Sequence, residues 1–141
     1  MEMTSKRLSK ITINRDKTIL IVEDDADFAL FLADAIAQET SYQPVVAQSA
    51  SQAFRLTQNI KPDLLILDYH LPSMNGLELY DWLCTDPIFE DVPALLLTAS
   101  QGMPTPEVKR RSIIGLGKPI ELDNFLDIVK NLLANGENKK H

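Results

Sequence analysis

Acidic, hydroxyl and amino side chains stand at the ends of four apolar segments of this 141-residue chain. They are Glu23, Asp24 and Asp25 after the first segment, Asp68 after the third, Thr98 after the fourth and Lys118 after the fifth. Carboxylates brought to one place repel each other, and a hard divalent cation relieves that repulsion. A metal beside a nucleophilic carboxylate and a positive charge is the arrangement that phosphoryl transfer needs.

Each of these groups has a chemical role and a simpler alternative. Asp68 can act as a nucleophile, because carboxylates form aspartyl-phosphate intermediates. Lys118 can supply positive charge to a phosphoryl group, and Thr98 can donate a hydroxyl hydrogen bond to it. Few protein ligands, with room for water and a phosphoryl oxygen, suit Mg²⁺ better than Ca²⁺. Taken singly, such residues are usually caps, turn residues or solvated charges. Their occurrence at the ends of four different segments favours a chemical role over these structural ones.

The apolar segments themselves indicate a buried parallel sheet. Their hydrophobicity is continuous rather than alternating, as expected for strands covered on both faces. The five segments are residues 18–22, 43–47, 64–67, 94–97 and 113–116. In an open parallel sheet, ligands bind outside the carboxyl ends of the strands, where the acidic, hydroxyl and amino groups fall.

The segments between the predicted strands have helical spacing of apolar residues, clearest in the stripe over residues 122–133. The fourth helix is the exception, because Gly102 and Pro104 sit where its first turn should be. We expect a short helix there, with Thr105 as its cap and Pro106 at its first position. The alternation predicts an α/β fold, with a doubly wound five-stranded parallel sheet and five helices, the fourth short or remodelled.

Composition and charge limit the classes of function. Apolar residues make up 45% and charged residues 24% of the chain, as in an ordinary globular domain. The net charge of −6 argues against direct nucleic-acid binding. One cysteine, Cys84, excludes an internal disulfide, and no apolar run is long enough to span a bilayer. We therefore expect a cytoplasmic protein without a membrane partner.

The length fits one domain, for which we expect the boundaries 17–134. Residues 1–16 are predicted to form a flexible basic arm, and residues 135–141 a polar C-terminal tail. The first 17 residues hold five basic side chains against two acidic ones. Two interpretations of the arm stay open, a solvated terminus or a segment that docks on an acidic partner.

Four stretches together resemble the receiver domain of bacterial response regulators. They are ILIVEDD at 19–25, DYHLPSMNG at 68–76 followed by LEL at 77–79, LTA at 97–99 and KPI at 118–120. The resemblance covers about residues 17–134. It implies the flavodoxin-like strand order 2-1-3-4-5.

The resemblance also implies roles by position. Asp68 would be the phosphoacceptor, Thr98 the switch hydroxyl and Lys118 the counter-charge for the phosphoryl group. Mg²⁺, or Mn²⁺ in its place, would be held by Glu23, Asp24 and Asp68, together with the backbone carbonyl of His70. Asp24 would be the more direct metal ligand, with Glu23 acting through water.

Three further positions are ones that vary in the family and tune the lifetime of the phosphoryl group. They are the imidazole of His70, Ala99 and Ser100. For His70 the alternative is a solvent-facing side chain without a role. The peptide bond between Lys118 and Pro119 is expected to be cis.

The function implied is signalling rather than enzymatic turnover. A histidine kinase or a histidine phosphotransfer protein would donate the phosphoryl group in a two-component system or phosphorelay, and an unknown downstream protein would respond. The chain would catalyse only its own phosphorylation and dephosphorylation. It would be a stand-alone receiver, a phosphorelay shuttle or an excised piece of a larger protein.

Three alternatives remain. A pseudo-receiver would keep the fold as an interaction module without the chemistry. A phosphohydrolase of the haloacid-dehalogenase type also uses an aspartate nucleophile, but its nucleophile follows the first strand, whereas Asp68 follows the third. A flavin-binding protein would need a phosphate loop after the first strand, where acidic residues exclude a phosphate.

Two departures from the family concern the output of the signal. Receivers usually carry an aromatic residue three positions before the lysine, and here that position is Gly115. The stretch between Thr98 and Lys118 is also shortened and contains the unusual fourth helix. We expect ordinary phosphoryl chemistry with a non-standard output face.

Overall fold

The strands form one parallel sheet in the predicted order. The structure, a computed structural model, describes residues 17–99 and 102–139. The expected basic arm and Ser100 lie outside these residues. The strands are β1 (Thr18–Val22), β2 (Gln43–Ala47), β3 (Leu64–Asp68), β4 (Ala94–Ala99) and β5 (Ile114–Lys118). Their order across the sheet is β2-β1-β3-β4-β5, and every neighbouring pair is parallel, which confirms the predicted fold class.

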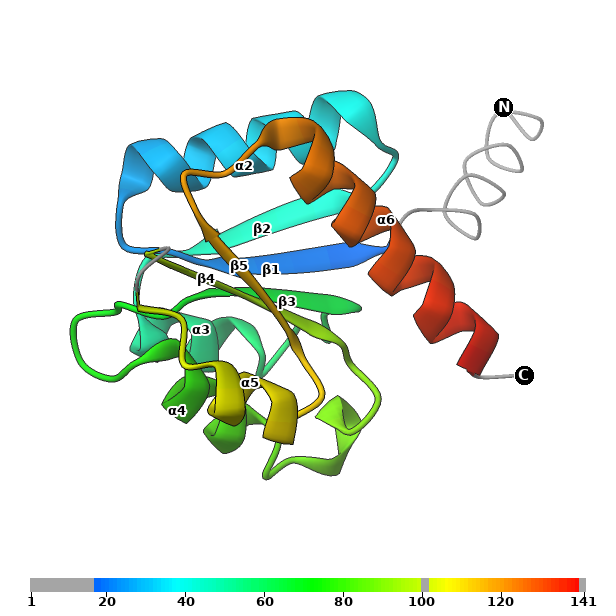
Figure 1. The fold of residues 1–141 in the computed structure, drawn as a ribbon. Helices are drawn as coiled ribbons and strands as arrows, with labels where there is room; N and C mark the ends of the chain where they lie inside the picture. The colour runs from blue at the N-terminus through cyan, green and yellow to red at the C-terminus, as the bar shows by residue number, and fades with distance from the viewer. Residues whose placement is uncertain (1–16, 100–101, 140–141) are drawn as a thin grey trace.

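Helices connect the strands and cover both faces of the sheet (Figure 1). They are α2 (Ala26–Glu39), α3 (Ala50–Leu56), α4 (Gly76–Leu83), α5 (Thr105–Arg110) and α6 (Leu122–Lys139), with a short 3₁₀-helix at Pro87–Phe89. Helices α2 and α6 lie on one face, and α3, α4 and α5 on the other (Figure 1). Among the described residues, no helix has both the length and the apolar character needed to cross a membrane.

Side chains that alternate along each strand feed two separate cores. On β3, Leu65 and Leu67 point into the core shared with α3, α4 and α5. Leu64 and Ile66 point into the core shared with α2 and α6, where Phe125 is fully buried. Because both faces of the central strands are covered, their sequences are continuously apolar.

Side-chain caps fix where several helices begin. The Asp25 carboxylate accepts a hydrogen bond from the backbone N–H of Phe28 and caps α2, and the Ser49 hydroxyl caps α3 in the same way. At α4, Asn75 and Glu78 form a reciprocal capping box. The first residues of α2 and α4 are therefore fixed directly beside the carboxyl ends of β1 and β3.

The fourth helix of the fold, α5, is short, as predicted, but begins differently. Its cap position is Pro104 rather than Thr105, and no side chain supplies a capping hydrogen bond. The expected cap was wrong because Thr105 has already entered the helix, which puts Pro106 at the second helical position. At the other end of the domain, α6 runs to Lys139, past the boundary expected at residue 134.

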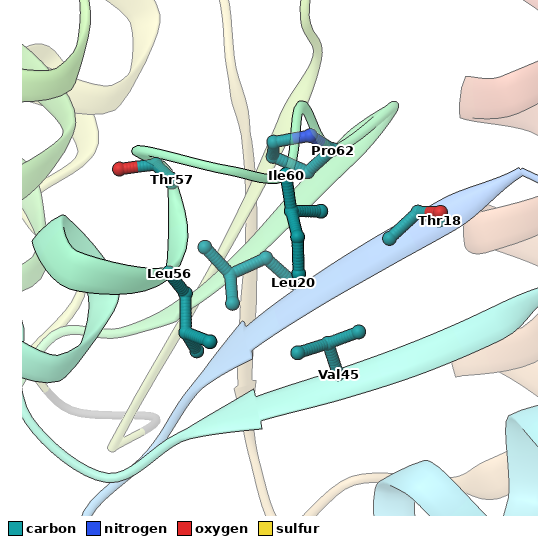
Figure 2. A pocket seen from close by; sticks show the side chains of 7 residues that line it. All are labelled: Thr18, Leu20, Val45, Leu56, Thr57, Ile60 and Pro62. Atoms are coloured by element: carbon teal, nitrogen blue, oxygen red, sulfur yellow. The ribbon is translucent and has the colours of Figure 1, made fainter.

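A small apolar hollow, without room for a water molecule, lies at the amino end of β1, at the far end of the strand from Glu23 (Figure 2). Its lining side chains are Thr18, Leu20, Val45, Leu56, Thr57, Ile60 and Pro62. None of these side chains is charged. The hollow therefore offers no group for the chemistry expected at the carboxyl ends of the strands.

Candidate functional site

The structure brings together the acidic side chains that the sequence places after β1 and β3. Glu23 and Asp24 follow β1, and Asp68 is the last residue of β3. One carboxylate oxygen from each of the three lies within 4.8 Å of the other two. This cluster at the carboxyl edge of the sheet fits a divalent cation, because it offers three hard oxygen ligands in one place.

Burial makes this cluster electrostatically costly. Glu23 is 2% exposed and Asp68 3% exposed, whereas Asp24 is exposed. Burial, together with the neighbouring Asp68 carboxylate, raises the pKa of Glu23 from 4.5 to about 7. The backbone N–H of Asp25, 3.1 Å from Glu23 Oε2, and the Lys118 ammonium act in the opposite direction. Without a cation, burial therefore favours the protonated form of the Glu23 carboxyl.

The amine of Lys118 reaches into the cluster from the end of β5. Its Nζ lies 3.4 Å from Asp68 Oδ1 and 3.5 Å from Glu23 Oε1. These distances are longer than the 2.7–2.9 Å typical of charge-assisted hydrogen bonds. The peptide bond from Lys118 to Pro119 is cis, as expected.

The backbone around Asp68 is held by its own loop. The N–H of His70 lies 3.4 Å from Asp68 Oδ1, and the N–H of Gly76 donates to the carbonyl of Tyr69 at 3.0 Å. A Cβ atom on Gly76 would lie only 2.5 Å from the carbonyl oxygen of Asp68. The close approach of α4 to the end of β3 therefore requires glycine at this position.

Thr98 lies on β4, next to Gly117 of β5 in the register of the sheet. The side chain is fully buried, and its Oγ1 has no hydrogen-bond partner within the described part of the chain. A buried hydroxyl without a partner is costly. It is consequently free to donate to a group that arrives at the carboxyl edge of the sheet.

Of the three residues expected to tune the site, His70 and Ala99 are exposed. The His70 side chain is exposed and packs edge-on against the ring of Tyr69, with ring centroids 5.0 Å apart. Ala99, the last residue of β4, is exposed. The third position, Ser100, is outside the described residues.

The missing aromatic residue at position 115 is replaced by a methionine from another segment. A Cβ atom on Gly115 would lie 2.5 Å from Met103 Sδ and 2.9 Å from its Cε. The thioether of Met103 therefore lies directly against the backbone of β5, in space that a side chain at 115 would need. Val108 of α5 is the next neighbour, at 3.6 Å.

Two residues of this region were missed by the sequence reasoning. No feature of the sequence identifies Met103, because only the folded chain brings it against Gly115. Phe28 was not among the predicted site residues, but the Lys118 ammonium lies 4.8 Å from the centroid of its ring. The one available hint was its position in the first turn after the acidic residues, where a helix faces the carboxyl edge of the sheet.

Comparisons with known proteins identify relatives of this chain. A family model of the response regulator receiver domain matches residues 19–130. The polar-differentiation response regulator DivK of Brucella ovis is 28% identical over 120 residues, which are 84% of this chain and 97% of that protein. The solved signal receiver domain of a signal transduction histidine kinase from Syntrophus aciditrophicus is 30% identical, with a TM-score of 0.74, over 84% of this chain and 91% of that one.

A third relative is longer than this chain. The phosphate regulon transcriptional regulatory protein PhoB of Pseudomonas aeruginosa is 39% identical over 83 residues, which are 59% of this chain. The match covers 36% of PhoB, so this chain spans little more than a third of that relative.

Proposed function

This chain belongs to the response regulator receiver family of two-component signalling, and we propose that it carries a phosphoryl group on the carboxylate of Asp68. One observation carries the proposal. The buried Asp68 carboxylate lies beside the acidic pair that follows β1 and 3.4 Å from the ammonium of Lys118. A nucleophile, a place for a cation and a fixed positive charge thus meet at one edge of the sheet.

The donor set fits Mg²⁺ or Mn²⁺, with Glu23, Asp24 and Asp68 and the backbone carbonyl of His70 as the residues that would hold it. The three carboxylates are close enough to share an ion. The raised pKa of Glu23 reports the repulsion and burial that a cation would offset. When bound, the cation would neutralise the negative charge of the incoming phosphoryl group.

The transfer follows from the side chains at the site. A carboxylate oxygen of Asp68 forms a bond to the phosphorus atom, and the P–N bond of a phosphohistidine in a kinase or phosphotransfer protein breaks. The electron pair of that bond stays on the donor imidazole. Lys118 Nζ donates to a phosphoryl oxygen, and the unpaired Thr98 hydroxyl donates to another.

Intact-protein mass spectrometry tests the proposal. After incubation with Mg²⁺ and acetyl phosphate, we expect a mass increase of one phosphoryl group. The increase should be absent in Asp68→Asn and in the presence of a chelator. Asp34→Asn, at an exposed position on α2, is the matched control and should be phosphorylated like the wild type. No increase in the wild type, or an increase that survives Asp68→Asn, would contradict the proposal.

A second part of the proposal concerns how the phosphoryl group is read. We infer a non-standard output face, in which Met103 replaces the aromatic side chain that receivers usually place on β5. A Cβ atom on Gly102 would lie 3.9 Å from Thr98 Oγ1, so the residue before Met103 lies beside that hydroxyl. A movement of Thr98 toward the phosphoryl group would therefore reach Met103 first, and α5 through it.

The methyl resonance of Met103 tests this path. In protein labelled with ¹³C-methyl methionine, the Met103 signal should shift when beryllium fluoride and Mg²⁺ are added. Thr98→Ser, which keeps the hydroxyl, should retain the shift, and Thr98→Ala should lose it. A crystal structure with the phosphoryl mimic that shows α5 displaced toward Lys118, with Met103 unmoved, would rule out the non-standard face.

A further inference from the structure

Beyond the proposed function, the structure assigns a positioning role to Phe28: its ring holds the Lys118 ammonium over the Asp68 carboxylate. The inference rests on the proposed function, in which Lys118 supplies charge to the phosphoryl group. Lys118 Nζ is 4.8 Å from the centroid of the Phe28 ring, within the range of cation–π attraction. Phe28 lies in the first turn of α2, shortly after Glu23 and Asp24 in the sequence.

The ring is fixed independently of Lys118. Phe28 lies in the first turn of α2, and its N–H donates to the capping carboxylate of Asp25 at 3.1 Å. Phe28 lies beside the half-exposed ring of Phe31, with centroids 6.3 Å apart and planes 20° from parallel, a contact at the long end of the range for aromatic pairs. It also packs against the core that α2 shares with α6. The helix end that follows the acidic residues thus presents a rigid aromatic face to the lysine.

Lys118 needs such a contact because its other contacts do not fix it. Its side chain is 33% exposed, and its two carboxylate contacts are 3.4 and 3.5 Å long. A lysine side chain is flexible, so long ion pairs alone leave it free to turn toward solvent. The ring attracts the ammonium but is neutral, so it does not compete with a phosphoryl oxygen for the N–H donors.

The contact also narrows the positions open to the Lys118 ammonium. Glu23 and Asp68 lie at nearly equal distances from Nζ, so the ion pairs alone do not select the nucleophile. Phe28 adds a third direction of attraction that restricts where Nζ can lie. Its contribution corresponds to about a three- to thirtyfold preference for the held orientation.

Two measurements on Phe28→Leu, Phe28→Tyr and Phe31→Leu test the role. The first is the ring-current shift of the Lys118 ε-methylene protons in protein without metal or donor, assigned with Lys118→Arg. The second is the rate of phosphorylation at saturating acetyl phosphate, together with the half-saturating concentration. Phe31→Leu removes a neighbouring ring that is 47% exposed, and it is the matched control.

In Phe28→Leu we expect the ring-current shift to disappear and the saturated rate to fall about three- to thirtyfold, with little change in half-saturation. Phe28→Tyr should keep both, and Phe31→Leu should resemble the wild type. The inference is overturned if Phe28→Leu retains the Lys118 shift, or if Phe28→Tyr is as slow as Phe28→Leu. If the wild type takes up no phosphoryl group, the proposed function fails, while the shift still decides whether Phe28 holds Lys118.

Discussion

Two glycines near the site have different reasons for lacking a side chain, and the difference predicts different costs. A methyl group on Gly76 would meet the carbonyl oxygen of Asp68 at 2.5 Å, and backbone cannot move away cheaply. A methyl group on Gly115 would meet the end of Met103, a flexible side chain.

We expect Gly76→Ala to lower the free energy of unfolding by about 2–3 kcal/mol, and Gly115→Ala by less than about 1 kcal/mol. Urea denaturation of the two variants measures both values. In a Met103→Ala background, Gly115→Ala should cost less still, because its obstacle is gone. An equal loss in the two single variants would show that the contact at Gly76 is not the rigid one.

The buried carboxyl of Glu23 predicts a pH dependence of stability in the metal-free protein. Its pKa is about 7 in the folded chain against an ordinary value of 4.5, so between these values the folded state binds more protons than the unfolded state. The free energy of unfolding should therefore fall as pH rises from about 4.5 to about 7 and level off above that. The loss due to this group is on the order of 3 kcal/mol.

Denaturation curves in a chelating buffer, compared between wild type and Glu23→Gln, isolate this contribution. The variant should lack the decline, because glutamine does not titrate. Glu90→Gln, at an exposed position after the 3₁₀-helix, should keep the decline. A wild-type curve parallel to that of Glu23→Gln would contradict the raised pKa.

At the scale of elements, α5 is anchored in part by a side-chain contact with α4. Arg111, directly after α5, donates from Nε and Nη2 to both oxygens of Asp81 on α4, at 2.8 and 2.7 Å. Its Nη1 also donates to the carbonyl of Glu107 at 2.9 Å. The guanidinium holds the pKa of Asp81 below its ordinary value. The amino end of α5 has no side-chain cap. The paired hydrogen bonds from Arg111 to Asp81, which we call the Arg111 fork, anchor its carboxyl end.

Removal of the fork should loosen α5 locally. We expect Arg111→Ala, and to a lesser degree Arg111→Lys, to speed amide hydrogen exchange in α5 about fivefold, corresponding to about 1 kcal/mol. Arg110→Ala is the control, because the exposed Arg110 forms its ion pair with Glu107 on the same helix. Exchange that is equally fast in Arg110→Ala would assign the effect to helix propensity rather than to the contact with α4.

The elements themselves were largely readable from the sequence. Continuous apolar runs predicted the strands, because both faces of a parallel sheet are buried, and the family resemblance gave their order. The start of α5 was misjudged by one residue, since a threonine between two prolines can serve as a cap or as the first helical residue. The end of α6 differed because its helical backbone continues beyond the apolar stripe.

The site was predictable only in part. The acidic cluster and Lys118 could be placed because strand ends share one edge of the sheet. The contact between Phe28 and Lys118 could not, because it depends on where tertiary packing places the first turn of α2 relative to the Lys118 side chain. The filling of the space at Gly115 by Met103 likewise depends on tertiary packing.

At the scale of the whole molecule, a chain with a net charge of −6 gathers three carboxylates at one end of its sheet, two of them buried. Among residues 17–99 and 102–139, Lys118 brings its ammonium within ion-pair distance of this cluster. The fold therefore keeps unfavourable charge repulsion at one edge. The cation site that we propose predicts that metal binding there stabilises the entire domain.

We expect Mg²⁺ at ten times its dissociation constant to raise the free energy of unfolding by about 1.4 kcal/mol, because the ion binds the folded chain and not the unfolded one. Asp68→Asn should be more stable than the wild type in chelator, since repulsion is relieved, and should gain less from Mg²⁺. Thermal denaturation with NaCl at matched ionic strength separates binding from screening. Asp91→Asn, at an exposed position before β4, should respond like the wild type. An equal gain from NaCl and Mg²⁺ would mean that the carboxylates are screened and not bound, and the proposed metal site would then have to be abandoned.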